Sequence, residues 1–351
     1  MLVGTVFMMV LAGCSTIDED LSDCGEEAKM DYELKLVTNM TTEIQTQLTA
    51  ETDISVAAEL HEHLSDIFTD FAHDVDLSFY NTVGDSLRLH HDEHIMDANQ
   101  QSYTLFIPRQ KYMHLAVANI VDNPLVDLKQ DERCHTSQIE QIVQQSHHAA
   151  TAQPDTIDSH STGLFTARQM MEMIEGIDQT FNVHLYMANC AAAVVLDPRG
   201  YSADGIQVYM TGFATAFNVA DSIYTFSDSS PIVRTVSLQQ ASEDGNPLCF
   251  CSVNFPSREP EPVTRSIVET EEPFIANPDE EALWEIRVYV PHENGTKDEY
   301  VLGIKDPLRA GQFRIIKVHM TEDGRIESDS PNVGVSVTLD WKPGGTYNPE
   351  L

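Results

Sequence analysis

The sequence predicts a mainly β protein made of two tandem β-sandwich domains, the first of which carries a short amphipathic helix. Apolar and polar residues alternate over many short runs, such as residues 31–37 and 181–187, and this period of two is typical of half-buried strands. Residues 55–72 instead place apolar residues at steps of three and four, which indicates a helix that covers a core. Many short strands separated by turns favour sandwiches over a parallel sheet.

The expected N-terminal domain covers residues 29–178. Its strands lie on both sides of the predicted helix, and a further short helix is expected at residues 168–177. The expected strands are residues 31–37, residues 74–80, a run that begins at Leu87, residues 103–107 and residues 112–118.

The expected C-terminal domain covers residues 179–351, with a boundary near residues 176–180. Residues 191–196 are apolar at every position, which predicts a strand buried on both faces. Residues 257–279 are rich in Pro and Glu and are interpreted as a long loop. The expected strands are residues 181–187, 191–196, 205–213, 221–226, 232–238, 248–255, 284–290, 299–304, 313–320 and 332–341.

Residues 1–13 are predicted to be a signal peptide. Residues 1–10 are almost wholly apolar, with no basic residue before them. This run is too short to cross a bilayer as a helix. The next residues, Leu-Ala-Gly-Cys, resemble a bacterial lipobox, which implies cleavage before Cys14 and a membrane anchor of acyl chains, palmitate included, on that cysteine. The alternative is an ordinary signal peptide that happens to contain a cysteine.

The charge of the chain limits its partners. Asp and Glu number 56 against 20 Lys and Arg, which gives a formal net charge of −36. Such a surface repels nucleic acid and anionic lipid heads, so any attachment to a membrane must come from the lipid. Residues 14–28 are predicted to be an acidic tether. Their acidic residues resemble the signal by which Bacteroidetes export lipoproteins to the cell surface.

The sequence predicts no catalytic, cofactor-binding or metal site, and therefore no enzyme. His90 and His94 would share a face only on a helix, and an exposed polar turn is the preferred interpretation of this stretch. Cys249 and Cys251 lack the second pair of ligands that zinc needs. The six cysteines could form disulfides in this compartment, although buried thiols are an equally good interpretation.

The last predicted strand has one wholly apolar face. Its apolar positions alternate with Gly, Ser, Thr and Asp. Because it lies near the C-terminus, it could close its own sandwich or be donated to a neighbouring subunit as an added strand. The closing strand is the simpler interpretation. The candidate residues for pairing with a partner are Val333, Val335, Val337, Leu339 and Trp341.

Several stretches, taken in order, resemble the fimbrillin-associated anchor lipoproteins of Bacteroidetes. They are the lipobox, residues 17–24, residues 75–80, residues 103–108, residues 183–190 and residues 335–341. The resemblance implies two transthyretin-like β-sandwich domains. It also implies an outer-membrane lipoprotein, exposed at the cell surface, that anchors a fimbrium, ends its growth and serves cell adhesion. The implied partners are fimbrillin-type subunits, bound by strand pairing.

Polymer subunits of that type lose an N-terminal segment to an Arg-directed protease. The first arginine of this chain is Arg88, deep inside the first predicted domain. The tether therefore offers no such cut, which favours an anchor over a stalk subunit.

The alternative function is a surface lipoprotein that binds glycans for polysaccharide uptake. A glycan site needs exposed aromatic platforms, and the two tryptophans, Trp284 and Trp341, both lie on predicted strands. Burial in the core is the simpler interpretation of both.

Overall fold

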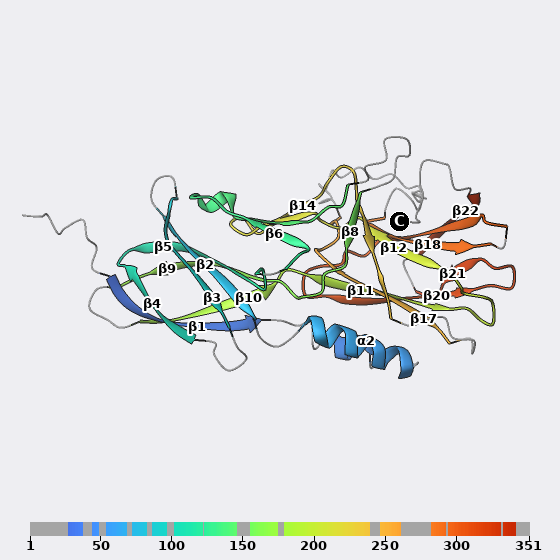
Figure 1. Ribbon diagram of the computed structural model, residues 1–351, viewed down its shortest axis with the longest axis horizontal. Coiled ribbons are helices and arrows are strands. Elements are labelled where there is room, and N and C mark those ends of the chain that lie inside the picture. The colour runs from blue at the N-terminus through green and yellow to red at the C-terminus, as the bar shows by residue number, and fades with distance from the viewer. Residues whose placement is uncertain are drawn as a thin grey trace, which may run out of the picture.

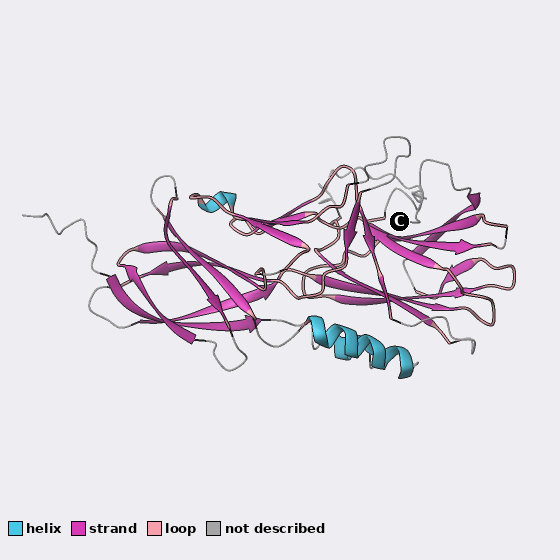
Figure 2. Ribbon diagram, viewed as in Figure 1, coloured by secondary structure: helices cyan, strands magenta, loops and turns pink. Residues whose placement is uncertain are grey.

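In the part of the chain that it describes, the computed structural model contains four β-sheets and very little helix (Figures 1 and 2). It describes residues 27–37, 44–48, 54–68, 72–82, 86–96, 102–121, 123–145, 155–174, 179–238, 246–260, 282–292, 294–330 and 333–341. The predicted signal peptide, most of the predicted tether, and Cys14 and Cys24 lie outside these residues. Among the described residues, no helix is long and apolar enough to cross a membrane.

A seven-stranded sheet forms the N-terminal part of the molecule, in the order β3-β2-β5-β9-β10-β1-β4. Its pairs are antiparallel except for β1 with β10. Its strands are β1 (Glu27–Val37), β2 (Asp74–Asn81), β3 (Arg88–Ile95), β4 (Ser102–Pro108), β5 (Lys111–Ala118), β9 (Phe165–Glu172) and β10 (Gln179–Met187).

A small four-stranded sheet, in the order β14-β13-β7-β6, combines segments from both halves of the chain. It packs on the seven-stranded sheet through a cluster that contains Tyr80, Leu115, Val117, Ile139 and Phe217. Its strands are β6 (Val126–Lys129), β7 (Gln138–Gln141), β13 (Ala216–Asn218) and β14 (Ile223–Thr225), and the 3₁₀ turn η1 (Cys134–Thr136) precedes β7.

Two further sheets form the C-terminal sandwich. The five-stranded sheet, in the order β16-β17-β11-β20-β21, consists of β11 (Cys190–Asp197), β16 (Val236–Ser237), β17 (Leu248–Asn254), β20 (Phe313–Met320) and β21 (Ile326–Ser328). The six-stranded sheet, in the order β22-β19-β18-β12-β15-β8, consists of β8 (Thr156–Asp158), β12 (Gln207–Thr211), β15 (Ile232–Arg234), β18 (Trp284–Pro291), β19 (Lys297–Ile304) and β22 (Val333–Trp341).

The core of this sandwich lies between the two sheets. Val194 and Leu196 of β11 pack in one buried cluster with Ile286 and Val288 of β18. Every residue of β11 except the last is buried, as the continuous apolar run predicts.

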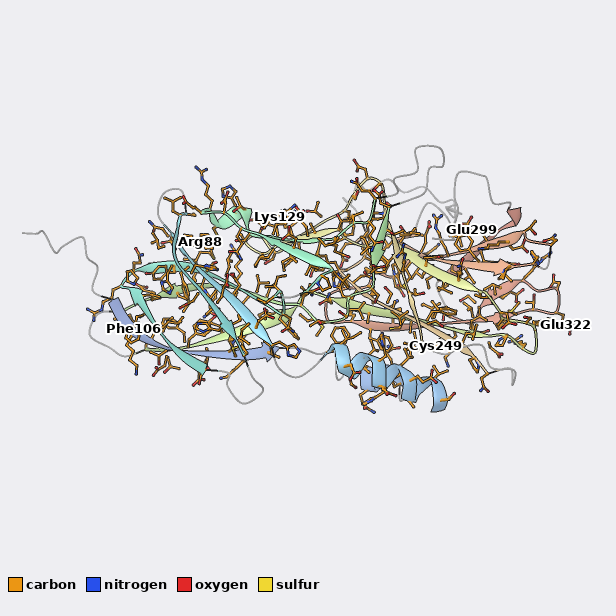
Figure 3. All side chains as sticks on the ribbon, in the orientation of Figure 1. Arg88, Phe106, Lys129, Cys249, Glu299 and Glu322 are labelled. Carbon is orange, nitrogen blue, oxygen red and sulfur yellow. The ribbon has the colours of Figure 1, made fainter. Side chains whose placement is uncertain are left out.

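The helix α2 (Ile54–Ile67) covers the outer face of the five-stranded sheet (Figure 1). Its buried residues Val56, Leu60 and Leu64 recur at a spacing of four and share a core cluster with Cys249 and Cys251 of β17. Figure 3 shows Cys249 on the sheet directly beside the helix. The sequence predicts the helix correctly. Although α2 belongs to the first half of the chain, it packs on a strand of the second half.

The mainly β fold with sandwiched sheets is confirmed, and two local predictions are corrected. Residues 168–177 were expected to be helical, yet residues 165–172 form β9 between β5 and β10. Residues 90–94 lie in the edge strand β3 and not in a turn. Residues 179–187 form β10, which pairs with β1 and β9 of the first sheet.

Candidate functional site

The candidate site for a partner is β22, which is the last strand of the six-stranded sheet. Among the described residues it has one strand neighbour, β19, with which it pairs antiparallel. No described strand is hydrogen-bonded to the opposite edge of β22, although β21 of the facing sheet lies close to β22. Such an edge presents backbone N–H and C=O groups that another strand can pair with.

The register ties β22 to the core of its own sandwich. Val333, Val335 and Val337 lie opposite Ile304, Leu302 and Tyr300 of β19, and the side chains of these three β19 residues are at most 2% exposed. Val333 is itself partly buried against that cluster. The apolar positions of β22 thus fall in register with buried positions of β19, as they do in a strand that closes a sandwich.

Two irregularities interrupt the pairing of β22 with β19. Gly303 and Gly334 lie opposite each other, and the register shifts between Lys297 and Glu299. A glycine inside a strand leaves room for another backbone to approach closely, and a shift of register bends and twists the edge. After the shift, Trp341 lies opposite Lys297.

An ion-pair network joins β18 to β19, the strand that pairs with β22. Arg287 donates to Glu285 at 3.1 Å and to Glu299 at 3.3 Å, and the Tyr289 hydroxyl donates to Glu299 at 2.8 Å. Burial lowers the pKa of Arg287, but the neighbouring carboxylates of Glu285 and Glu299 outweigh this effect, so the pKa is raised. Arg287 lies opposite Val301, which in turn lies opposite Ser336, and Glu299, labelled in Figure 3, lies opposite Thr338 of β22.

The first strand is built into the N-terminal sheet. β1 lies between β10 and β4, and its residues Met30 and Tyr32 are fully buried. The Tyr32 hydroxyl lies 2.5 Å from Nε2 of His114 on β5. Arg88 is on β3, where its Nη1 donates to Oε1 of Gln130 at 3.1 Å. The first arginine thus lies within a folded strand.

β22 and the start of β1 lie at opposite ends of the long axis of the molecule (Figure 1). Glu27, the first residue of β1, follows shortly after Cys14 in the sequence. A chain held at its N-terminal end would therefore present β22 at its far end.

The other residues singled out in the sequence are placed as follows. Trp284 is 1% exposed, and its indole N–H donates to the carbonyl oxygen of Asp306 at 3.0 Å, as expected for a core residue. Cys134, Cys190 and Cys251 are buried thiols, and burial raises the pKa of Cys251 to about 12. None of these three cysteines forms a disulfide among the described residues.

The sequence patterns did not reveal one group of side chains with metal-ligating atoms close together. Asp76 on β2 and His91 and Glu93 on β3 bring their polar atoms within 4.8 Å of one another. The alternation of His91 and Glu93 along one strand is visible in the sequence, but their proximity to Asp76 depends on strand pairing, which periodicity does not give.

No protein-family model matches this sequence, and no curated protein matches it significantly. Solved structures do match. A candidate adhesin from Bacteroides ovatus ATCC 8483 is 12% identical, with 92% of this chain and 99% of that chain covered and a TM-score of 0.50. A second candidate adhesin from Bacteroides ovatus is 9% identical, with 88% and 96% covered and a TM-score of 0.51.

The fimbrial anchor protein Mfa2 from Porphyromonas gingivalis is also among the structural neighbours, at 11% identity, 90% and 98% coverage and a TM-score of 0.44. The predicted resemblance to surface proteins of Bacteroidetes is confirmed at the level of the fold. The chain shares its fold with the two candidate adhesins from Bacteroides ovatus.

Proposed function

We propose that this chain is a lipid-anchored protein of the outer membrane that holds a fimbrium at the cell surface. In this proposal the acyl chains on Cys14 hold the N-terminal end at the membrane. A fimbrillin-type subunit adds a strand to the free edge of β22 at the other end. A partner bound at the end of the sheet in this way also stops further growth of the polymer there.

The observation that carries the proposal is the place of β22. It is nine residues long, it ends its sheet, and it lies at the end of the molecule away from Glu27. Addition of a strand to a sheet edge binds a partner through main-chain hydrogen bonds. The distance between the two ends of the molecule separates the membrane attachment from the partner, as an anchor requires.

Addition to the free edge of β22 is favoured over donation of β22 itself. Donation would remove β22 from β19 and expose Tyr300, Leu302 and Ile304, which are at most 2% exposed. Exposing apolar surface costs about 25 cal/mol per Å², whereas edge addition exposes none of it. The facing glycines Gly303 and Gly334 leave space near this edge for a second backbone.

The first strand also supports an anchor. β1 is bonded on both sides and carries buried residues, so its removal would open the N-terminal core. With the first arginine at Arg88 on β3, the chain keeps β1 in this proposal, and the N-terminal sheet offers no groove for a donated strand. The candidate adhesins that share the fold support a role in surface adhesion.

Cross-linking from β22 in intact cells tests the proposal. A photo-reactive amino acid replaces Thr338 on β22 in one strain and the exposed Glu62 on α2 in a matched control strain. We expect Thr338 to capture a β-sandwich subunit that Glu62 does not capture. Capture of a transporter component, or of a sugar polymer with no protein, would overturn the proposal in favour of glycan binding.

A further inference from the structure

A hollow of about 360 Å³ lies over β2 and β3, on the side of the seven-stranded sheet that faces β6. Carboxylate, imidazole, amide and guanidinium groups line it together with a few apolar residues. The polar residues of its wall are Asp76, Arg88, His91, Glu93, Asp127 and Gln130.

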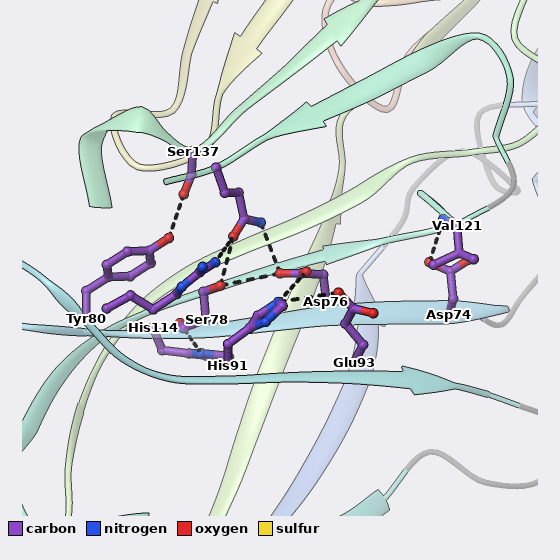
Figure 4. Close-up of polar contacts among 11 residues, drawn as sticks. Asp74, Asp76, Ser78, Tyr80, His91, Glu93, His114, Val121 and Ser137 are labelled. Carbon is purple, nitrogen blue, oxygen red and sulfur yellow. Dashed lines mark hydrogen bonds and ion pairs between the residues drawn. The ribbon is translucent and has the colours of Figure 1, made fainter. Parts of the chain in front are cut away.

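Three of these residues point toward one another (Figure 4). Nε2 of His91 lies 2.7 Å from Oδ2 of Asp76 and 3.7 Å from Oε1 of Glu93. Strand pairing produces this arrangement, because Asp76 lies opposite Glu93 and Ser78 lies opposite His91, and residues opposite each other share a face of the sheet.

A chain of hydrogen bonds fixes the carboxylate of Asp76. Oδ1 accepts from Nε2 of Gln130 at 3.0 Å, and Oε1 of Gln130 accepts from Ser78 at 3.0 Å and from Arg88 at 3.1 Å. Because Ser78 and Arg88 both donate to that oxygen, the amide of Gln130 must turn its NH₂ group to Asp76. Oδ2 is thereby left for His91 and for the hollow.

The hydrogen bonds that hold the Asp76 carboxylate are of the kind that orient metal ligands. Ligating carboxylates and imidazoles are usually held by hydrogen bonds from neighbouring groups. Asp76 is only 7% exposed, and a buried carboxylate is costly unless it is paired or bound to a cation. Arg88 is bonded to Gln130 and not directly to Asp76.

We propose that Asp76, His91 and Glu93 bind one divalent transition-metal ion of the Zn²⁺ class. One imidazole nitrogen and two carboxylate oxygens form a ligand set that Zn²⁺ accepts at about 2.0–2.2 Å, with a fourth position open. Tetrahedral ligand atoms at such distances lie about 3.4 Å apart, and the three atoms here need small adjustments to reach that spacing. Imidazole makes Ca²⁺ and Mg²⁺ poor candidates, because both prefer oxygen ligands.

All three residues line the hollow, so water or a carboxylate of a molecule bound there could complete the coordination. The ion would join β2 to β3, which is the edge strand of its sheet. The net charge of −36 raises the local concentration of cations near the molecule. This site is remote from β22, and its presence does not depend on the role of that strand.

Isothermal titration calorimetry with Zn²⁺ tests this site on the full chain from which any polyhistidine tag has been removed. We expect one ion per chain for the native protein. The variants His91→Asn and Glu93→Gln should each weaken binding by about tenfold or more, since the loss of even an outer partner of a metal ligand costs about 10–100-fold in affinity. The Glu93 side chain is 66% exposed, so Glu93→Gln leaves the fold intact.

Asp92→Asn provides the matched control. Asp92 lies between His91 and Glu93 in the sequence but on the other face of β3, where it contacts His90 at 3.2 Å and His94 at 3.8 Å. We expect this variant to bind Zn²⁺ as the native chain does. No binding to the native chain, unchanged binding in both His91→Asn and Glu93→Gln, or loss of binding in Asp92→Asn alone would overturn the proposal.

Discussion

At the scale of single residues, His114 on β5 connects β1 to β2 within the N-terminal core. Its Nδ1 donates to the carbonyl oxygen of Ser78 at 3.1 Å, and its Nε2 accepts from the Tyr32 hydroxyl at 2.5 Å. The carbonyl oxygen can only accept, so Nδ1 carries a proton, and in a neutral ring Nε2 is then the acceptor. The ring also stacks on Phe79, with 4.4 Å between ring centroids. His114 is therefore held as a neutral imidazole.

Burial lowers the pKa of His114 to about 3 and that of His160 to about 4. An unfolded chain titrates its histidines near pH 6.5. Below that pH the unfolded state binds protons that the folded state does not bind. The free energy of unfolding therefore falls as the pH falls, by up to about 1.4 kcal/mol per pH unit for each group, until the folded pKa is reached.

We predict that replacement of His114 by Gln makes this loss of stability shallower. Urea denaturation of the native chain and of His114→Gln between about pH 7 and about pH 5 measures it. The amide of Gln keeps a donor for Ser78 and an acceptor for Tyr32 but does not titrate, so the variant should lose less free energy of unfolding over that interval. The same pH dependence in both proteins would show that His114 is not buried as a neutral ring.

At the scale of elements, periodicity predicts those strands in which apolar residues alternate with more polar ones. Val75, Leu77 and Phe79 alternate along β2, and Val183, Leu185 and Met187 alternate along β10, and all six are buried. The helix α2 follows its spacing in the same way. Its packing partner could not be predicted, because an apolar helix face shows that a core is covered but not which sheet supplies it.

Local propensity misled the prediction for residues 168–177. This stretch is rich in Met and Glu, which are good helix formers. In the structure β9 is bonded to β5 along its whole length and to β10 at one end, and these long-range bonds outweigh a weak local preference. The pairing of β10 with β1 is likewise a contact between distant segments that no local pattern reveals.

The candidate sites show the same limit. The apolar alternation of β22 is visible in the sequence, whereas its place at the end of a sheet follows from topology. Asp76 meets His91 and Glu93 only because β2 pairs with β3 in one register. A shift of that register by one residue would place these groups on opposite faces.

A disulfide between β19 and β22 tests how β22 takes part in binding. Val301 and Ser336 lie directly opposite each other, and cysteines at both positions would lock β22 in its own sheet. Because edge addition leaves the pairing of β19 with β22 intact, we predict that the oxidised double variant still cross-links its partner from position 338. Loss of the cross-link on oxidation, with recovery on reduction, would instead mean that β22 is donated.

At the scale of the whole molecule, membrane attachment and partner binding are separated. The surface carries a formal net charge of −36, so it is repelled by anionic lipid heads. Two acyl chains are needed for stable attachment, at about 0.8 kcal/mol per buried methylene. The proposed lipid on Cys14 must therefore supply the whole of the affinity for the membrane.

We predict that Cys14→Ala moves the protein from the membrane pellet to the soluble fraction without unfolding it. Cys24→Ala, which removes a cysteine of the same segment, should leave the protein in the pellet. Membrane fractionation with a high-salt wash, followed by circular dichroism of the released protein, makes the comparison. A Cys14→Ala protein that stays in the washed pellet would contradict lipid attachment at this residue.

Cross-linking from position 338 in intact cells shows whether a fimbrial subunit adds a strand to β22. We expect mass spectrometry of the cross-linked product to identify a β-sandwich subunit, joined to this chain through a peptide from one of its strands. We also expect the control at position 62 to give no such product. A product that joins position 338 to a transporter or a glycan, or equal capture of the subunit from position 62, would contradict strand addition at β22.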